Sequence, residues 1–134
     1  MTCPAILENL DSGVSISVEV IVDSGCQFPL TLDDDDILTL GLGLSTATGR
    51  TTLPDGSIAP LQYYRAVQLT LTLNDGSIAQ AILNPLVITK DETEDAIGVN
   101  AHERLIGFPS MDMLGLKLDF RNKKLVRRTI PLRA

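Results

Sequence analysis

Two turns of the same composition most constrain what this chain can fold into. Asp-Gly-Ser occurs at 55–57 and again at 75–77, and each copy lies between segments in which apolar and polar residues alternate. Alternation with a period of two indicates half-buried strands, and Asp-Gly between two such strands is a strong hairpin signal. Residues 45–88 are therefore predicted to form two successive β-hairpins. Because the flanks of the two turns do not match, we attribute their similarity to shared turn chemistry rather than to a repeat.

An earlier strand is predicted to lead into a polar triplet. Residues 14–22 are rich in β-branched side chains and alternate with polar ones until they end in three successive apolar residues, 20–22. A strand that becomes apolar on both faces is entering the interior of a protein. The triplet Asp23-Ser24-Gly25, which follows directly, is therefore expected near the middle of the fold. That is an unusual place for an acid.

Short helices and further strands complete the pattern. The four aspartates 33–36 complement and cap the start of one short helix, which Gly41 would end, while Pro109 and Gly115 bracket a second. Residues 105–107 and 116–132 indicate further strands, and the acidic segment 90–103 is expected to be a surface loop. About eight strands without a long helix predict one mostly-β domain over 1–134, closed into a barrel.

Composition sets the broad class. The chain has 134 residues, of which 44 % are apolar and 4 % aromatic, as expected for a folded domain with an aliphatic core. No segment is apolar enough for a membrane span, and the first residues do not resemble a secretory signal, so we expect a soluble, cytoplasmic protein with no membrane partner. Cys3 and Cys26 are then expected as free thiols, with a bridge between them as the alternative.

Charge is distributed unevenly along the chain. The net charge is −6, yet residues 117–134 hold seven of the eleven Lys and Arg residues, and residues 1–49 hold none. A basic tail can bind nucleic acid. Here the basic residues alternate with Leu125, Val126, Ile130 and Leu132, which favours the solvated face of a half-buried strand. We therefore expect no nucleic-acid partner.

Several kinds of reactive site are disfavoured by spacing. Residues 33–36 lack the ligand spacing of a calcium loop, and no metal site is predicted there. A pairing of His102 with Cys26 or Ser24 would need a third, orienting group that the sequence does not indicate. No phosphate-binding glycine pattern or cofactor motif occurs, so no cofactor is predicted. A plain turn remains one interpretation of Asp23-Ser24-Gly25, whose context makes it the best candidate for chemistry.

Taken in order, the segments of this chain resemble the retropepsin-like aspartic proteases, most closely the small single-domain bacterial members. The segments that carry the resemblance are VEVIVDSG (18–25), TLDDDDILTLGL (31–42), TTLPDGSIAPLQYY (51–64), AVQLTLTLNDGSIAQAILNPLVI (66–88), LIG (105–107) and MDMLGLKLDFRNKKL (111–125). In that family they are an apolar strand before Asp-Ser/Thr-Gly, a short helix, a flap hairpin, a second hairpin, an apolar strand ending in Gly, and a helix followed by a strand pair. The resemblance spans about residues 14–126.

The resemblance implies a closed acid-protease barrel and an activity. Asp23, Ser24 and Gly25 would be the catalytic triplet, and Asp55, Gly56, Ser57 and Ile58 would lie at the tip of a flap that binds substrate. Peptide hydrolysis by this route needs two carboxylates that share one proton around a water molecule. Because the chain has one such triplet, the second carboxylate would come from another copy in a two-fold homodimer.

Under this hypothesis the protein is an aspartic endopeptidase that acts on peptides or proteins. The alternative is a non-catalytic peptide-binding or dimerisation module that keeps the protease fold. The sequence departs from the family at Cys26, where a small or aromatic residue such as Ala is common, and at Pro109, where Asp or Asn is common. The loop at 89–103 is also longer than in viral members.

Overall fold

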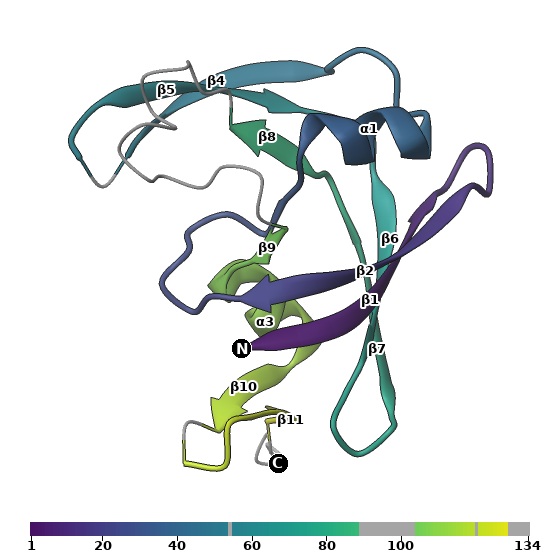
Figure 1. The fold of residues 1–134 in the computed structure, drawn as a ribbon, viewed down its shortest axis with the longest axis vertical. Coiled ribbons are helices and arrows are strands. Elements are labelled where there is room, and N and C mark those ends of the chain that lie inside the picture. Colours follow the sequence, from purple (N-terminus) through teal and green to yellow (C-terminus); the bar gives the residue numbers. More distant parts are fainter. Residues whose placement is uncertain (54, 89–103, 120, 129–134) are drawn as a thin grey trace, which may run out of the picture.

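A computed structural model describes residues 1–53, 55–88, 104–119 and 121–128. Within these residues the fold is mostly β, with one nine-stranded mixed sheet, a separate two-stranded sheet and two short helices (Figure 1). The elements are β1 (Thr2–Asn9), β2 (Ser15–Val22), β3 (Leu30–Thr31), α1 (Asp34–Leu40), β4 (Ala47–Thr52), β5 (Ile58–Tyr63), β6 (Val67–Thr72), β7 (Ile78–Leu83), β8 (Leu86–Ile88), β9 (Leu105–Ile106), α3 (Phe108–Leu114), β10 (Leu116–Asp119) and β11 (Lys124–Arg127).

The large sheet runs in the order β4-β5-β8-β3-β9-β2-β1-β6-β7. β2 pairs with β1 in antiparallel fashion on one side and with β9 in parallel fashion on the other. The two predicted hairpins are β4–β5 and β6–β7, and they lie at opposite ends of this order. The smaller sheet is the hairpin β10–β11, at the lower end of the molecule in Figure 1.

The predicted closure of the barrel is not found among the described residues. The outermost strands, β4 and β7, do not pair with each other, so the sheet is open. A side chain covers part of the free edge of β7 instead, since Arg127 Nη2 donates to the Ile78 carbonyl oxygen over 2.6 Å. Covering a free edge with another part of the chain is a common way to keep that edge from recruiting another strand.

One apolar core lies beneath the strands, built from the inward-facing side chains of β1, β2, β6 and β7 together with α1 and α3. Its largest fully buried members are Leu7, Leu30, Leu32, Leu40, Leu69, Leu71, Ile106, Leu125, Val20 and Val67. These residues are almost all aliphatic, as the low aromatic content predicts. No helix in the described ranges has the length and apolar character to cross a membrane.

The helices begin and end where the sequence predicts. Asp33 caps α1 by accepting a hydrogen bond from the Asp36 N–H, and Gly41 ends the helix with a φ of 67°. α3 begins after Gly107, carries Pro109 in its first turn and ends at Gly115 with a φ of 68°. The predicted loop at 90–103 and the predicted end of the last strand, 129–132, lie outside the described residues.

Three strand assignments needed the structure, among them the two-residue β3. β1 was not predicted, although it is a central strand whose buried face consists of Cys3, Ala5, Leu7 and Asn9. The segment 78–88, predicted as one strand, is divided into β7 and β8 at Asn84-Pro85. Pro85 has no N–H to donate to a sheet, and its carbonyl oxygen accepts a hydrogen bond from the Tyr64 N–H instead.

Candidate functional site

The loop that follows β2 carries the Asp23-Ser24-Gly25 triplet. The backbone of Asp23 is fixed at both ends, because its N–H donates to the Ile106 carbonyl oxygen over 3.0 Å and its own carbonyl accepts from the Cys26 N–H over 3.1 Å. The triplet is exposed, whereas the sequence predicts a position in the interior. The burial of β2 ends with Val22, and the chain then turns out of the core.

The carboxylate of Asp23 is held by its own turn. Its Oδ1 accepts a hydrogen bond from the Gly25 N–H over 2.9 Å, while no described residue hydrogen-bonds to its Oδ2. A Cβ at position 25 would lie 3.3 Å from Asp23 Oδ1, a distance that would crowd the carboxylate. Gly25 thus allows the backbone to approach the Asp23 carboxylate closely. One carboxylate oxygen is left available for a water molecule, a substrate or a second chain.

The segment 104–110 supports this loop from below. Gly107 lies directly against it, because a Cβ at this position would overlap the carbonyl oxygens of Phe28 and Cys26. The Phe108 N–H donates to Cys26 over 3.1 Å, and the Ser110 hydroxyl donates to the Pro29 carbonyl oxygen. The beginning of α3 therefore fixes the far half of the loop, as β9 fixes its near half.

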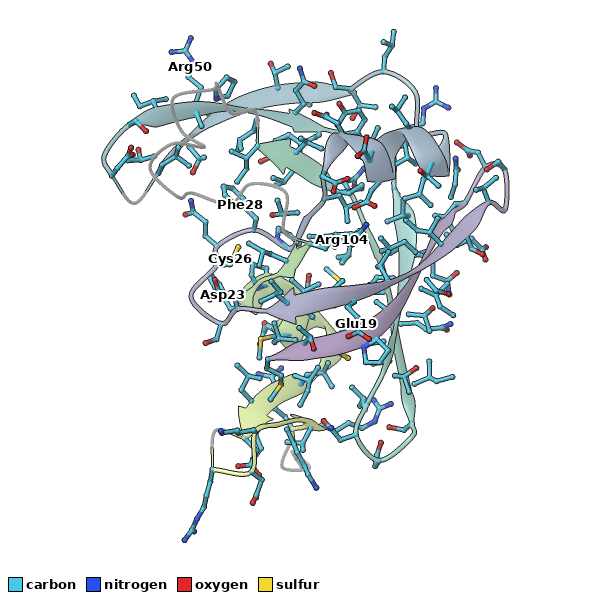
Figure 2. The ribbon with its side chains drawn as sticks, in the orientation of Figure 1. Glu19, Asp23, Cys26, Phe28, Arg50 and Arg104 are labelled. Atoms are coloured by element: carbon cyan, nitrogen blue, oxygen red, sulfur yellow. The ribbon has the colours of Figure 1, made fainter. Side chains whose placement is uncertain are left out.

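The β4–β5 hairpin projects from the same side of the molecule as this loop (Figure 1). Gln27 Nε2 donates to Thr51 Oγ1 over 3.2 Å, which joins the loop to β4. Figure 2 shows Cys26 and Phe28 on the part of the loop that runs from Asp23 toward the hairpin, while the Arg50 side chain points away from the loop. The hairpin predicted as a flap is thus in contact with the candidate catalytic loop.

The hairpin tip is a tight turn. Gly56 has a φ of 88°, and Asp55 Oδ1 accepts hydrogen bonds from the Ser57 hydroxyl over 2.6 Å and the Ser57 N–H over 2.9 Å. These two bonds lower the pKa of Asp55. The Ile58 side chain is 65 % exposed, so it is free to contact a ligand.

A hollow of about 480 Å³ opens beside the triplet. It is lined by Met1, Val22, Asp23, Ser24, Leu118, Asp119 and Lys123. The structure therefore brings Asp23 and Ser24 together with the β10–β11 turn, at the opposite side of the loop from its contact with Thr51. None of the predicted flap residues 55–58 lines this hollow.

Both described cysteines are free thiols, Cys3 buried and Cys26 half-buried. Burial raises the pKa of the Cys26 thiol, the hydrogen bond to the Phe28 carbonyl opposes this shift, and the negative charge of Asp23 adds to it. Cys26 is thus a neutral neighbour of the carboxylate. The alternative nucleophile pairs need His102, which lies outside the described residues.

Sequence analysis missed a buried ion pair between α1 and the residue that precedes β9. Arg104 donates to both carboxylate oxygens of Asp36, over 2.8 Å each, and the Asp36 side chain is only 4 % exposed. Asp36, Ile37 and Leu40 form the buried face of α1, and this spacing was the available signal. Within the described ranges, no cluster of three His, Cys, Asp or Glu side chains could hold a metal ion.

Asp119 and Lys123 were also missed as lining residues. The sequence indicates strands within 116–132 but gives no sign that the turn between them lies beside Asp23. In comparisons with known proteins, no family model, no curated protein and no solved structure matches the chain.

Proposed function

We propose that this chain is one subunit of a homodimeric, retropepsin-like aspartic endopeptidase, with Asp23 as the catalytic carboxylate. The observation that carries the proposal is the state of Asp23. Its backbone is fixed by β9, one carboxylate oxygen is held by Gly25, and the residue lines an open hollow. An exposed but rigidly held acid beside a space for substrate is what general acid–base catalysis needs.

The second carboxylate is assigned to another copy of the chain. Asp119 lines the same hollow, but both its oxygens accept hydrogen bonds from Asn122, over 3.2 and 2.8 Å. Asp119 is therefore committed to its own turn. In a two-fold dimer Asp23 would face Asp23 of the other subunit. Because two negative charges so close together repel each other, the two carboxylates would share one proton. One carboxylate would then activate water while the protonated one donates to the carbonyl oxygen of the peptide.

The wider protease architecture belongs to this proposal as well. The order of strand, triplet, short helix, hairpins, Gly107 and final strand pair agrees with the retropepsin-like pattern. Closure of the barrel would have to involve residues outside the described ranges or the second subunit. Ser24 would hydrogen-bond to the carboxylate or across the dimer, and residues 55–58 would close over an extended peptide.

One observation favours a second candidate, a peptide-binding or dimerisation module without turnover. The tip residues 55–58 do not line the hollow beside Asp23, as a closed flap would. A module of this kind would keep the dimer and bind peptides but would not cleave them.

The decisive experiment compares wild type with Asp23→Asn. Asn keeps the shape but cannot act as a base or share the proton, so cleavage of a denatured protein should fall by about 10²-fold or more. Cleavage is followed by mass spectrometry at pH 5 and pH 8, with and without pepstatin. The matched control is Glu19→Gln, which removes one exposed carboxylate from β2 and should cleave like wild type.

Sedimentation of the same proteins tests the dimer. Without repulsion between facing carboxylates, the Asp23→Asn dimer should be at least as tight as wild type at pH 8. Undiminished cleavage by Asp23→Asn would remove Asp23 from the mechanism. A wild-type dimer without cleavage would favour the binding module, and a monomer at every pH would contradict the shared site.

A further inference from the structure

The β4–β5 hairpin is anchored to the large sheet along only part of its length. β5 pairs with β8 over Leu61–Tyr63, whose partners are Leu86–Ile88. Nearer the tip, Ile58–Pro60 pair only with β4 in the described part of the chain, and β4 is the outermost strand of the sheet. We call residues 50–53 and 55–60 the outer half of the hairpin. This half lies beyond the last strand that ties the hairpin to the body of the protein.

One side-chain hydrogen bond joins the outer half to the loop that carries Asp23. Gln27 Nε2 donates to Thr51 Oγ1 over 3.2 Å. The Arg50 side chain points away from the loop in Figure 2, and alternation along the strand turns the next side chain, that of Thr51, toward it. Among the described residues, the other hydrogen bonds of the outer half stay within the hairpin. This bond is therefore the polar link that sets the distance between hairpin and loop.

Gln27 extends from a backbone that cannot easily move. On one side of it, the Cys26 carbonyl oxygen accepts a hydrogen bond from the Phe108 N–H over 3.1 Å. On the other side, the Phe28 carbonyl oxygen lies so close to Gly107 that a Cβ would not fit between them. The segment that supports the candidate carboxylate from below thus also supports the residue that reaches the hairpin.

We infer that the bond between Gln27 and Thr51 positions the outer half of the hairpin for peptide binding, and that both are positioning residues of the endopeptidase. This inference rests on the proposed function. A peptide between the Asp23 loop and the hairpin would contact both of them. A hairpin already held at the right distance from the loop does not have to be ordered when the peptide binds, so less binding energy is lost. Neither side chain touches the reacting atoms.

Loss of this bond should weaken peptide binding without slowing the chemical step. The apparent affinity falls in proportion to the fraction of molecules whose hairpin is in position. One neutral hydrogen bond changes such an equilibrium by about fivefold. KM should therefore rise by about fivefold while kcat stays unchanged, because the bond from Gly25 to Asp23 is not disturbed.

The experiment uses matched substitutions at the two ends of the bond. Thr51→Val removes the hydroxyl and keeps the branched shape, whereas Thr51→Ser keeps the hydroxyl and should restore wild-type behaviour. Gln27→Leu removes the donor at an exposed position. The control is Thr70→Val, which breaks a bond of the same kind and length, from Gln80 Nε2 to Thr70 Oγ1 over 3.2 Å, in the β6–β7 hairpin. KM and kcat are measured with one peptide that wild type cleaves.

The position of the hairpin is measured separately from cleavage, as amide order parameters from nuclear magnetic relaxation. In Thr51→Val and Gln27→Leu, the amides at positions 51 and 53 should become less ordered, toward the values below about 0.6 that mark a flexible segment. The amide of Gln62, in the part of β5 that pairs with β8, should keep its order. Thr70→Val should leave all three amides and both kinetic constants unchanged.

The possible failures are distinguishable. Wild-type order and wild-type KM in both Thr51→Val and Gln27→Leu overturn this inference and leave the proposed function standing. Lower order with an unchanged KM shows a bond that is only structural, and an equal rise of KM in Thr70→Val shows an effect that is not specific to this bond; either result also overturns the inference. No cleavage by wild type overturns the proposed function and this inference together. If Thr51→Val does not fold, Gln27→Leu decides by the same two measurements.

Discussion

Gly107 shows how a single residue can set the geometry of the site. It lies beneath the loop that carries Asp23, so close to the carbonyl oxygens of Cys26 and Phe28 that no side chain fits. Its φ is −101°, within the range of any residue, so lack of space rather than conformation requires glycine here. The sequence indicates an apolar strand ending at a glycine, but only the folded chain shows what that glycine faces.

Substitution of Gly107 by Ala should therefore destabilise the protein. The new Cβ forces the backbone of the loop to move, and overpacking of this kind costs about 1–3 kcal/mol. The free energy of unfolding is measured by urea denaturation. Gly49→Ala is the matched control, since its Cβ would meet only Tyr63 at an ordinary 3.6 Å, in a strand where Ala is tolerated better than Gly. Equal stability of Gly107→Ala and wild type would contradict the close approach.

Candidate residues differ in how far sequence reasoning can place them. Asp23 and its turn could be predicted because an apolar strand before Asp-Ser-Gly is a local pattern. Lys123 could not, since its relation to Asp23 depends on how the final hairpin packs against the end of β2. The exposure of the triplet was also missed, because a run of apolar residues does not say where a strand leaves the core.

At the scale of elements, the ion pair between α1 and β9 joins two segments that are far apart in sequence. Asp36 lies on the buried face of α1, and Arg104 immediately precedes β9, where its carbonyl oxygen accepts the Ile21 N–H over 2.7 Å. Figure 2 shows Arg104 between α1 and β2. Arg104 thus connects the helix to the two strands that fix Asp23.

Removal of one partner should be costly. Asp36→Asn leaves the Arg104 guanidinium half-buried without its counter-charge, at a cost of about 3 kcal/mol, the low end for a buried pair because Arg104 is 34 % exposed. Asp11→Asn breaks the 3.4 Å ion pair with Arg65. The Asp11 side chain is 70 % exposed and that of Arg65 is 66 % exposed, so this variant should change stability little. Thermal unfolding compares the two variants. If the two variants lose the same amount of stability, the Asp36–Arg104 pair does not stabilise the fold.

At the scale of the whole molecule, three turns contain the same arrangement, an Asp carboxylate that accepts hydrogen bonds from a residue of its own turn. Asp55, Asp75 and Asp119 each accept a side-chain and a backbone hydrogen bond from a residue two or three positions ahead, and in each case these bonds lower the pKa of the carboxyl. A carboxyl whose pKa is lower in the folded state stabilises the fold above its unfolded pKa. That stabilisation is lost as the pH falls through the lower, folded pKa.

The protein should therefore lose stability below about pH 4, near the ordinary pKa of Asp. Asp75→Asn tests this at a turn away from the candidate site. The variant should melt at a lower temperature than wild type at pH 7, and the difference should shrink as both proteins are taken toward pH 2. A difference that stays constant with pH would show that the charge of Asp75 contributes nothing to the turn.

The general class of fold was accessible from sequence, and its topology was not. Alternating segments and Asp-Gly turns predicted both long hairpins, and capping residues predicted both described helices. The predicted barrel did not close in the described residues, because pairing between distant strands leaves no local signal. β1 was missed because Pro4 and the small residues Cys3 and Ala5 weaken the strand pattern. The structure tolerates Pro4 because the pairing of β1 with β6 begins only at Ala5, so Pro4 has no partner on that side.

The parallel pairing of β2 with β9 also determines when the site can form. Val22 is opposite Ile106, about 80 residues along the chain, and the Asp23 N–H bonds to that same residue. Closing so long a loop carries a large entropic cost, which must be met before the contact contributes any stability. During synthesis the chain through residue 103 can pair the end of β2 with β1 but not yet with β9 on its other side. The candidate carboxylate therefore gains its geometry late in folding, after the last quarter of the chain is made, and an incomplete chain would carry the acid without the site.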